Sequence, residues 1–185
     1  MSPKELSQYN LIQGHFLVPR FKDLPGKRIT FLRDPVQRVL SAHRYYIQRL
    51  NRNNELMCLQ HLCPPGPPLI ALKNQQCRFL STLDINDPTI TDRQHLESAK
   101  YNLKNNFFFV GITEDLNHAL PILATLLGFD PPATVPMMNR TRKTNGQYSA
   151  TLLEEIRNRN LEDIELYLFA KKLYETKFKH KNLLL

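Results

Sequence analysis

Residues 28–41 read Arg-Ile-Thr-Phe-Leu-Arg-Asp-Pro-Val-Gln-Arg-Val-Leu-Ser, and this stretch decides the fold. Residues 29–32 are an apolar, β-branched and aromatic run that is short enough to be a buried strand. Asp34 and Pro35 then supply an N-cap and a proline at the first helical position, which favours a helix directly after the strand. Gln37 stands at the capping-box spacing from Asp34. The stretch therefore predicts a strand that passes into a helix reaching to about residue 50.

Two side chains belong to this strand-to-helix corner. Arg33 is the residue before the predicted N-cap, and Ser41 lies in the helix, roughly 10 Å along its axis at the helical rise. A long guanidinium that folds back over the first turns could nearly span that distance, so Arg33 and Ser41 could hold one anion. The alternative is an ordinary helix start with a surface arginine and a neutral serine, and the spacing alone does not separate the two.

The chain is long enough to form one domain with its own core. It has 185 residues, of which 42% are hydrophobic and 9% aromatic, and we expect a single globular domain over residues 1–185. The 25 Lys and Arg residues exceed the 17 Asp and Glu residues, which gives a formal charge of +8. Such a charge favours a polyanionic partner: a nucleotide, a sulfated or carboxylated glycan, nucleic acid or anionic lipid.

The cysteines, at positions 58, 63 and 77, are odd in number and favour free thiols in a reducing compartment. Residues 58–63 read Cys-Leu-Gln-His-Leu-Cys, but structural zinc sites usually combine two separated ligand pairs, so we expect no metal. No apolar run approaches the roughly 20 residues that a membrane span needs, and the N-terminus lacks a signal-peptide core. The sequence as given therefore predicts a cytoplasmic protein without a membrane span.

Downstream of residue 68, predicted helices surround a second strand. Helices are expected over residues 69–81, 92–105 and 113–127 and from residue 161 onward, and the continuous apolar run at residues 107–112 predicts an interior strand of a parallel sheet. Thr113 is expected to cap the helix that Gly128 ends. Thr151 and Glu154 form a further capping-box pattern. This pattern places the chain in the α/β class.

The pattern Arg-Asp-Pro-x-x-Arg-x-x-Ser at residues 33–41, entered from an apolar strand, resembles the 3′-phosphate-binding motif of the Golgi-type carbohydrate sulfotransferases. That family includes heparan sulfate 2-O-sulfotransferase, the type we expect here. The resemblance implies that Arg33 and Ser41 bind the 3′-phosphate of the sulfuryl donor PAPS (3′-phosphoadenylyl sulfate). It also implies a P-loop-like sulfotransferase domain, with a central parallel sheet flanked by helices, and a Golgi membrane location for a eukaryotic parent protein.

A histidine near the N-terminus is the candidate catalytic base. The segment Gly14-His15 is similar to one in which some members of the family, notably the 2-O-sulfotransferase branch, use a histidine in that role. Histidine suits the role because its ordinary pKa lies near neutrality, so it can accept the proton of an attacking hydroxyl. A packed structural histidine is the alternative for His15.

Residues 74–80 resemble the family's Asn-x-Gln-Thr-Arg-x-Leu segment, with a cysteine where a threonine is usual. The resemblance implies that Asn74, Gln76 and Arg78 line the cleft and contact donor or acceptor. An amphipathic helix that shows its amides to water is the alternative for each of them. The Val-Gly-Ile-Thr-Glu run at residues 110–114 also resembles the family, but as scaffold, so we assign Glu114 no catalytic role.

Two irregular segments are candidates for ligand contact. Residues 51–68 are rich in asparagine and proline, and a segment of this length in a compact domain is typical of a binding loop or linker, here for acceptor specificity. Residues 129–148 pass from proline-rich to basic and could cover a bound polyanion. A merely solvated basic loop is the alternative for this second segment.

One part of the family pattern has no counterpart in this sequence. The family begins with a strand and a Pro-Lys-Thr/Ser-Gly-type loop, whose amides and lysine hold the 5′-phosphosulfate, and nothing in the sequence matches it. Sulfuryl transfer depends on positioning and on cations that neutralise the leaving group. We therefore expect an N-terminally truncated domain that lacks the first strand and the phosphate loop, and that is incomplete or inactive as given.

The leading hypothesis is a PAPS-dependent sulfotransferase that acts on a hydroxyl of a carbohydrate acceptor. The alternative is a non-catalytic remnant of that fold that binds a nucleotide or a glycan. Nucleic acid is not an expected partner, because the cations are dispersed along the sequence and no nucleic-acid-binding motif accompanies them.

Overall fold

The computed structural model describes residues 8, 11–12, 18, 25–50, 73–131 and 148–179. In these residues the elements follow one another as β1 (Ile29–Leu32), α3 (Pro35–Leu50), α5 (Gln75–Leu80), α6 (Asp92–Asn105), β2 (Phe109–Ile112), the 3-10 turn η1 (Thr113–Asp115), α7 (Leu116–Leu127), α8 (Ala150–Asn158), α9 (Leu161–Tyr174) and the π-helical turn η2 (Glu175–Lys179).

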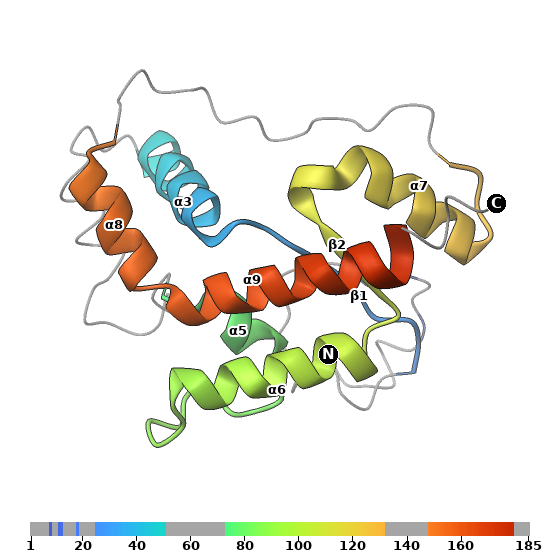
Figure 1. The fold of residues 1–185 in the computed structure, drawn as a ribbon, viewed down its shortest axis with the longest axis horizontal. Helices are drawn as coiled ribbons and strands as arrows, with labels where there is room; N and C mark the ends of the chain where they lie inside the picture. The colour runs from blue at the N-terminus through green and yellow to red at the C-terminus, as the bar shows by residue number, and fades with distance from the viewer. Residues whose placement is uncertain are drawn as a thin grey trace.

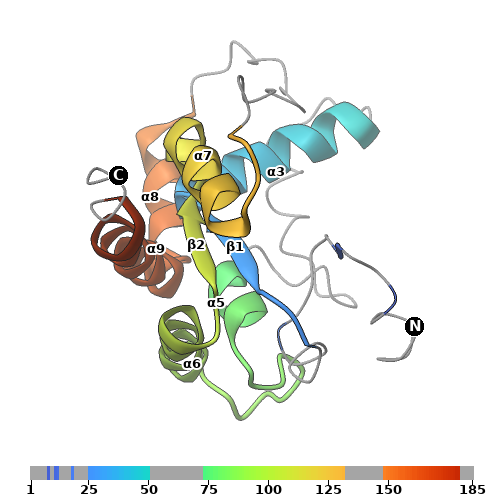
Figure 2. The same cartoon turned by 90° about the vertical axis from the view of Figure 1, so that its right-hand side faces the viewer.

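The two strands pair in parallel, with Ile29 opposite Phe109 and Leu32 opposite Ile112. Because the strands are parallel, their carboxyl ends lie at one edge of the sheet. Figure 2 shows α3 and α7 leaving from that edge, and α6 lying toward the opposite end of the strands. The strands and flanking helices confirm the α/β class expected from the sequence.

The core surrounds β2, all four residues of which are buried. The ring of Phe109 packs against Phe31, Tyr174 and Phe178, with ring centroids 5.8, 6.4 and 4.8 Å away. Opposite Phe31 in the sheet register is Gly111, where an added Cβ would overlap the Phe31 ring. Glycine is therefore required at this position for the two strands to pair with the aromatic ring in place.

Helix α9 joins the parts of the fold to one another. Asp163, Leu166, Ala170 and Tyr174 are its buried residues, and their spacing of three or four marks a single inner face. Figure 1 shows α9 extending across the molecule with α6 beside it. Helix α9 also contacts β2 and α5, so it touches the sheet as well as the helices α5 and α6.

A smaller apolar cluster fixes the orientation of α3. Val36, Val39 and Leu40 are buried against Ile156 of α8, with partly buried residues around them. Because these residues define the inner face of α3, Arg38 and Ser41 lie on a different face of the helix, and both are half-buried. The packing of α8 therefore determines which side of α3 is turned toward the corner.

Several predicted element boundaries are confirmed. The strand at residues 29–32, the helix to residue 50, the helix over residues 92–105 and the helix from residue 161 all occur where expected. Gly128 ends α7 in the left-handed region, at φ 78°. Cys77 is a free and buried thiol, as predicted. In the described part of the chain, no helix is both long and apolar enough to span a membrane.

Three predicted helix starts are wrong. Helix α5 begins at Gln75, because Asn74 before it adopts a left-handed conformation at φ 48°. The cap of α8 is Ser149, whose hydroxyl accepts a bond from the Leu152 N–H at 3.2 Å, so the box expected from Thr151 does not form. After β2 the chain enters η1 without a side-chain cap from Thr113, and α7 begins only at Leu116.

Candidate functional site

The candidate site lies at the carboxyl edge of the sheet, where β1 passes into α3. Arg33 directly follows the last residue of β1, and the parallel register brings the end of β2 beside it. In α/β sheets, ligands bind outside the carboxyl ends of the strands. Arg33 is therefore in a position from which a side chain can contact such a ligand.

The main chain of Arg33 is held by one side-chain amide. Gln76 Oε1 accepts a hydrogen bond from the Arg33 N–H at 3.0 Å, and Gln76 Nε2 donates one to the Arg33 carbonyl at 2.9 Å. The amide thus pairs with both polar main-chain groups of Arg33, as a neighbouring strand would. The guanidinium itself has no hydrogen-bond or ion-pair partner among the described residues.

The next residue, Asp34, is held from two directions. Its Oδ1 accepts from the Gln37 N–H at 2.8 Å, which confirms half of the predicted capping box. The other half differs, because the Asp34 N–H donates to Glu114 Oε1 at 3.0 Å. The physical reason is the parallel register, which places Glu114, two residues after the end of β2, at the same sheet edge as Asp34.

Glu114 has a second partner that completes this bracing. Tyr167 of α9 donates its hydroxyl to Glu114 Oε2 at 3.2 Å. Burial and the Glu114 charge raise the pKa of Tyr167 to about 12, so the phenol stays a neutral donor at physiological pH. Glu114 therefore connects the start of α3 to α9, a structural role that agrees with the scaffold interpretation.

These bonds limit how the corner can bind an anion. The N-terminus of a helix usually attracts anions through its free N–H groups. Here the Asp34 N–H is bonded to Glu114, the Gln37 N–H is bonded to Asp34, and Pro35 has no N–H. Fewer main-chain donors than usual are therefore open to an anion at this helix start, and side chains would have to supply part of its contacts.

A second cation stands near Arg33. Burial lowers the pKa of Arg38, the Asp163 carboxylate acts against that decrease, and the positive charge of Arg33 adds to it. The charge of Arg33 therefore acts on Arg38 in the same direction as burial. Ser41 lies one turn beyond Arg38, and residues three apart on a helix are neighbours on its surface. Arg33, Arg38 and Ser41 thus follow one another along a single strand-to-helix unit, although Arg38 is engaged with Asp163 and Gln75.

Asp163 anchors this arrangement from within the core. Its Oδ2 accepts from the Gln76 N–H at 3.0 Å and its Oδ1 from the Cys77 N–H at 2.8 Å, which caps α5. Arg38 Nη2 lies 3.9 Å from Asp163 Oδ2, and Arg38 Nη1 donates to Gln75 Oε1. Burial raises the pKa of the fully buried Asp163, while Arg38 and the two amide N–H groups oppose the rise. Asp163 therefore positions Gln76 and Arg38 together.

Asn74, one of the predicted contact residues, faces the protein interior. It is fully buried, and its Nδ2 donates to Glu162 Oε2 at 2.6 Å while its Oδ1 accepts from the Asp163 N–H at 3.2 Å. The Asn74 N–H donates to Asn160 Oδ1 at 3.0 Å. These bonds use its polar groups to join the start of α5 to the start of α9.

Arg78, another predicted contact residue, is paired with α6. Its Nη2 and Nε lie 2.8 and 3.3 Å from Asp92 Oδ1, and Lys73 Nζ lies 2.9 Å from Asp92 Oδ2. Partial burial acts to raise the pKa of Asp92, but bonds from Arg78 and Lys73 lower it to about 2. Of the three predicted residues in this segment, only Gln76 touches the corner, and their contact with donor or acceptor stays a prediction.

Other parts of the sequence-based hypothesis lie outside the described residues. This holds for His15, for the segment 51–68 and for residues 132–147 of the basic loop. The structure therefore places the predicted phosphate-binding residues, Arg33 and Ser41, on one strand-to-helix unit and leaves the predicted base as a prediction.

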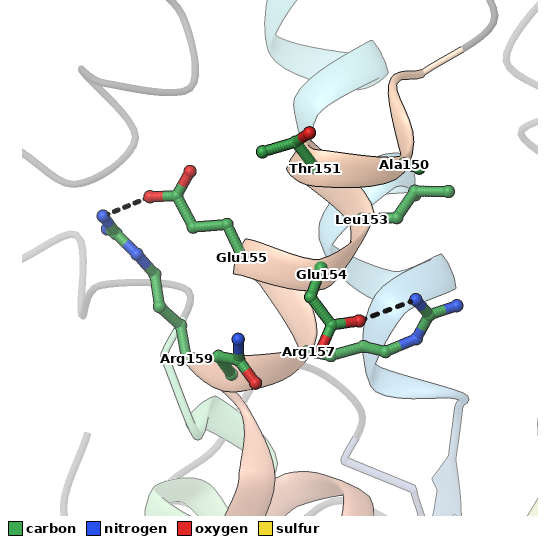
Figure 3. Close-up of a pocket in the computed structure, with 8 residues that line it drawn as sticks. Ala150, Thr151, Leu153, Glu154, Glu155, Arg157 and Arg159 are labelled. Carbon is green, nitrogen blue, oxygen red and sulfur yellow. Dashed lines mark hydrogen bonds and ion pairs between the residues drawn. The ribbon is translucent and has the colours of Figure 1, made fainter.

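Hollows on the described surface offer a comparison with the candidate site. One, of about 1150 Å³, is lined in the described residues by a single helix, α8 (Figure 3). Its charged groups pair with one another: Arg157 Nη1 lies 3.4 Å from Glu154 Oε2, and Arg159 Nη2 lies 2.5 Å from Glu155 Oε1. No predicted site residue lines this hollow, so it gives no support to the candidate site.

The other hollow, of about 290 Å³, lies at the end of β2. Its polar residues include three acids and one lysine: Glu114, Asp115, Glu175 and Lys171. Carboxylates repel a phosphate, so this hollow does not suit the anion. It touches the corner through Glu114 and is not lined by Arg33.

Sequence reasoning missed the residues that hold the corner in place. Gln76 was proposed as a ligand contact, Glu114 was explained by the helix dipole, and Asp163 had no role. Each of these side chains meets a main-chain group that lies 43 to 87 residues away. No local spacing signals such a contact, although the resemblance of residues 74–80 to a family segment did mark Gln76.

Comparison with known proteins finds relatives among the heparan-sulfate sulfotransferases. The chain is 30% identical to heparan-sulfate 6-O-sulfotransferase 2 of Danio rerio, over 81% of this chain and 38% of that protein. It is 28% identical to human heparan-sulfate 6-O-sulfotransferase 2, over 79% of this chain and 29% of that protein. Human heparan-sulfate 6-O-sulfotransferase 3 is 27% identical, over 82% of this chain and 38% of its own length.

These relatives bear on two expectations. Their names specify 6-O-sulfotransferases, so the expected 2-O type is not supported. The chain spans less than two fifths of the length of the relatives that it matches. A model of the sulfotransferase family matches residues 10–179, which include both strands and all the helices described above. The chain therefore belongs to the sulfotransferase family, a family of transferases.

Proposed function

We propose that this chain is the donor-binding part of a PAPS-dependent carbohydrate sulfotransferase, in which Arg33 and Ser41 bind the 3′-phosphate of the donor. One observation carries the proposal. The Arg33 guanidinium extends from a main chain held at two points, and no described residue neutralises its charge. A doubly charged phosphate is a natural partner for an arginine held in this way.

We infer that the acceptor is a glycan of the heparan-sulfate type. The relatives act on heparan sulfate by name, and the formal charge of +8 suits an acidic polysaccharide. The same names favour the 6-hydroxyl over the 2-hydroxyl as the position modified. His15 remains our candidate for the base, on the strength of the Gly14-His15 resemblance.

The proposed residues divide the work of the reaction. When bound, PAPS supplies an activated sulfuryl group. His15 accepts the proton of the attacking hydroxyl at one of its ring nitrogens. Arg33 and Ser41 fix the nucleotide through its 3′-phosphate, so that their contribution is orientation of the donor. Arg38 adds positive charge to the same corner. Through its contacts with Asp163 and Gln75 it also joins α3 to α9 and α5.

Isothermal titration with 3′,5′-adenosine bisphosphate tests the donor site. The chain should bind the nucleotide, and Arg33→Ala should weaken binding by tenfold or more, since a charge-assisted hydrogen bond contributes about 1.5–3 kcal/mol. Ser41→Ala should weaken binding by roughly fivefold, because a neutral hydroxyl contributes about 1 kcal/mol. Binding is the sharper measurement because 3′,5′-adenosine bisphosphate keeps the 3′-phosphate and lacks the sulfuryl group, so its affinity does not depend on the residues that hold the transferred group.

The matched control is Arg93→Ala on α6. Arg93 is exposed and pairs with Glu97 and Glu165, so its removal changes the net charge by the same amount at a distance from the corner. Affinity equal to that of the unchanged chain is expected for Arg93→Ala. Equal binding by all variants, or no binding by any, would contradict the donor-site assignment. Nucleotide binding without sulfation of heparan-sulfate chains would instead support the non-catalytic alternative.

A further inference from the structure

The side chain of Gln76 is bonded to the protein main chain, so its amide is not free to contact a ligand. Its side-chain amide is engaged with the Arg33 N–H at 3.0 Å and the Arg33 carbonyl at 2.9 Å, and the side chain is half-buried. The two bonds also fix which end of the amide faces which group, since only Oε1 can accept and only Nε2 can donate. An amide used in this way is turned toward the main chain of the corner.

Gln76 is itself fixed by the buried Asp163. The Gln76 N–H donates to Asp163 Oδ2 at 3.0 Å, and the next N–H, of Cys77, donates to Oδ1 at 2.8 Å. Asp163 also lies 3.9 Å from Arg38 Nη2. A connected path therefore runs from α9 through α5 to the end of β1. It ends at Arg33, whose guanidinium has no partner among the described residues.

The corner needs such support because the arginine side chain is flexible. Its guanidinium binds a ligand more tightly when the main chain that carries it is held in place. Misplacement of a binding group by about 1 Å can cost a large factor in rate or affinity. The Asp34 N–H bond to Glu114 holds the far side of the corner, and Gln76 holds the Arg33 side. The two contacts come from different elements and restrain successive residues.

We propose that Gln76 is a positioning residue for the donor site: it fixes the main chain from which Arg33 reaches the 3′-phosphate, without touching the nucleotide itself. This inference rests on the proposed function. Gln76→Glu should fail in this role, because a carboxylate has no donor for the Arg33 carbonyl and adds a negative charge to a corner that must attract a phosphate.

A double-mutant cycle with 3′,5′-adenosine bisphosphate tests the proposal. Gln76→Ala should weaken binding by about fivefold to tenfold, but in the Arg33→Ala background the same change should have no further effect. Gln94→Ala is the control, because Gln94 forms the capping box of α6 through Thr91 and its loss lowers stability away from the corner. That control should bind as the unchanged chain does.

Hydrogen exchange of the Arg33 amide, followed by NMR without nucleotide, gives a second readout. The amide should be protected in the unchanged chain and in Gln94→Ala, and should exchange faster in Gln76→Ala. If Gln76→Ala does not fold, Gln76→Glu keeps the side-chain volume and should lose at least as much affinity, because it loses one bond and adds a negative charge.

The outcomes separate this inference from the proposed function. Unchanged affinity in the Gln76 variants, with faster Arg33 exchange, overturns the positioning role and leaves the donor site intact. An equal loss of affinity with and without Arg33 also overturns it, because Gln76 would then contact the nucleotide directly. Absence of binding by the unchanged chain overturns the proposed function, and the positioning role with it.

Discussion

At the scale of single residues, the corner between β1 and α3 is held by side chains that bond to main-chain groups. Gln76 pairs with Arg33, and Glu114 accepts from the Asp34 N–H. Such bonds restrain the backbone and leave the Arg33 guanidinium without a partner among the described residues. An anion site requires a backbone that is held in place and a guanidinium that is not already bonded to the protein.

Asp92 shows how a single carboxylate makes stability depend on pH. Its pKa, about 2, lies below the ordinary value of 3.8, because Arg78 and Lys73 stabilise its charged form against partial burial. A lowered folded-state pKa contributes stability above the ordinary value, and that stability is lost as the pH falls from about 4 toward 2. Urea unfolding at several pH values should show this loss, and Asp92→Asn should show a smaller one. Equal acid sensitivity of the two proteins would contradict the assignment.

At the scale of elements, helix starts depend on which residue can reach a free N–H. The start of α8 has two polar candidates, Ser149 and Thr151, and the structure assigns the cap to Ser149 at 3.2 Å from the Leu152 N–H. A serine in an extended conformation can turn its hydroxyl back over the first helical turn, whereas Thr151 already lies inside the helix.

The two candidates for this cap can be separated by mutation. Ser149→Ala should lower the free energy of unfolding by about 1 kcal/mol, the usual value of an N-cap. Thr151→Ala should leave it nearly unchanged, or raise it slightly, because alanine is the better helix former. Urea denaturation of both variants measures the difference. A larger loss from Thr151→Ala than from Ser149→Ala would mean that the capping box predicted from sequence forms after all.

At the scale of the whole molecule, α9 connects the sheet, the corner and the helices α5 and α6. Its Asp163 holds α5, its Tyr167 holds Glu114, and its Tyr174 donates to Asp115 at 3.2 Å. These contacts join residues that lie 53 to 86 positions apart in the sequence. The geometry of the candidate site therefore depends on the docking of a helix that contributes no proposed ligand contact.

Asp163 should be among the residues most sensitive to substitution. Asp163→Ala leaves the N–H groups of Gln76 and Cys77 without their acceptor and removes the carboxylate that is ion-paired with Arg38. Removing one partner of a buried ion pair costs about 3–5 kcal/mol. The control is Glu154→Ala, which removes an exposed acid paired with Arg157 and should cost less than about 1 kcal/mol. Urea denaturation measures both, and similar losses for the two variants would contradict the central role of Asp163.

The sequence by itself determined the local pieces. The apolar run at residues 29–32 and the Asp34-Pro35 start predicted β1 and α3 correctly, because strand and helix signals act over a few residues. The order of the family-like segments predicted the sulfotransferase family, which the family model confirms. Arg33 and Ser41 as phosphate ligands, and His15 as the base, remain predictions.

Only the tertiary structure decided what surrounds the corner. The partners of Arg33, Asp34 and Gln76 come from elements far away in the chain, and the parallel register of β1 and β2 brings Glu114 to the same edge. The same packing turned Asn74 inward and paired Arg78 with Asp92, where the sequence suggested cleft residues. The reason is that long-range contacts follow from how faces pack together, and packing has no local sequence pattern.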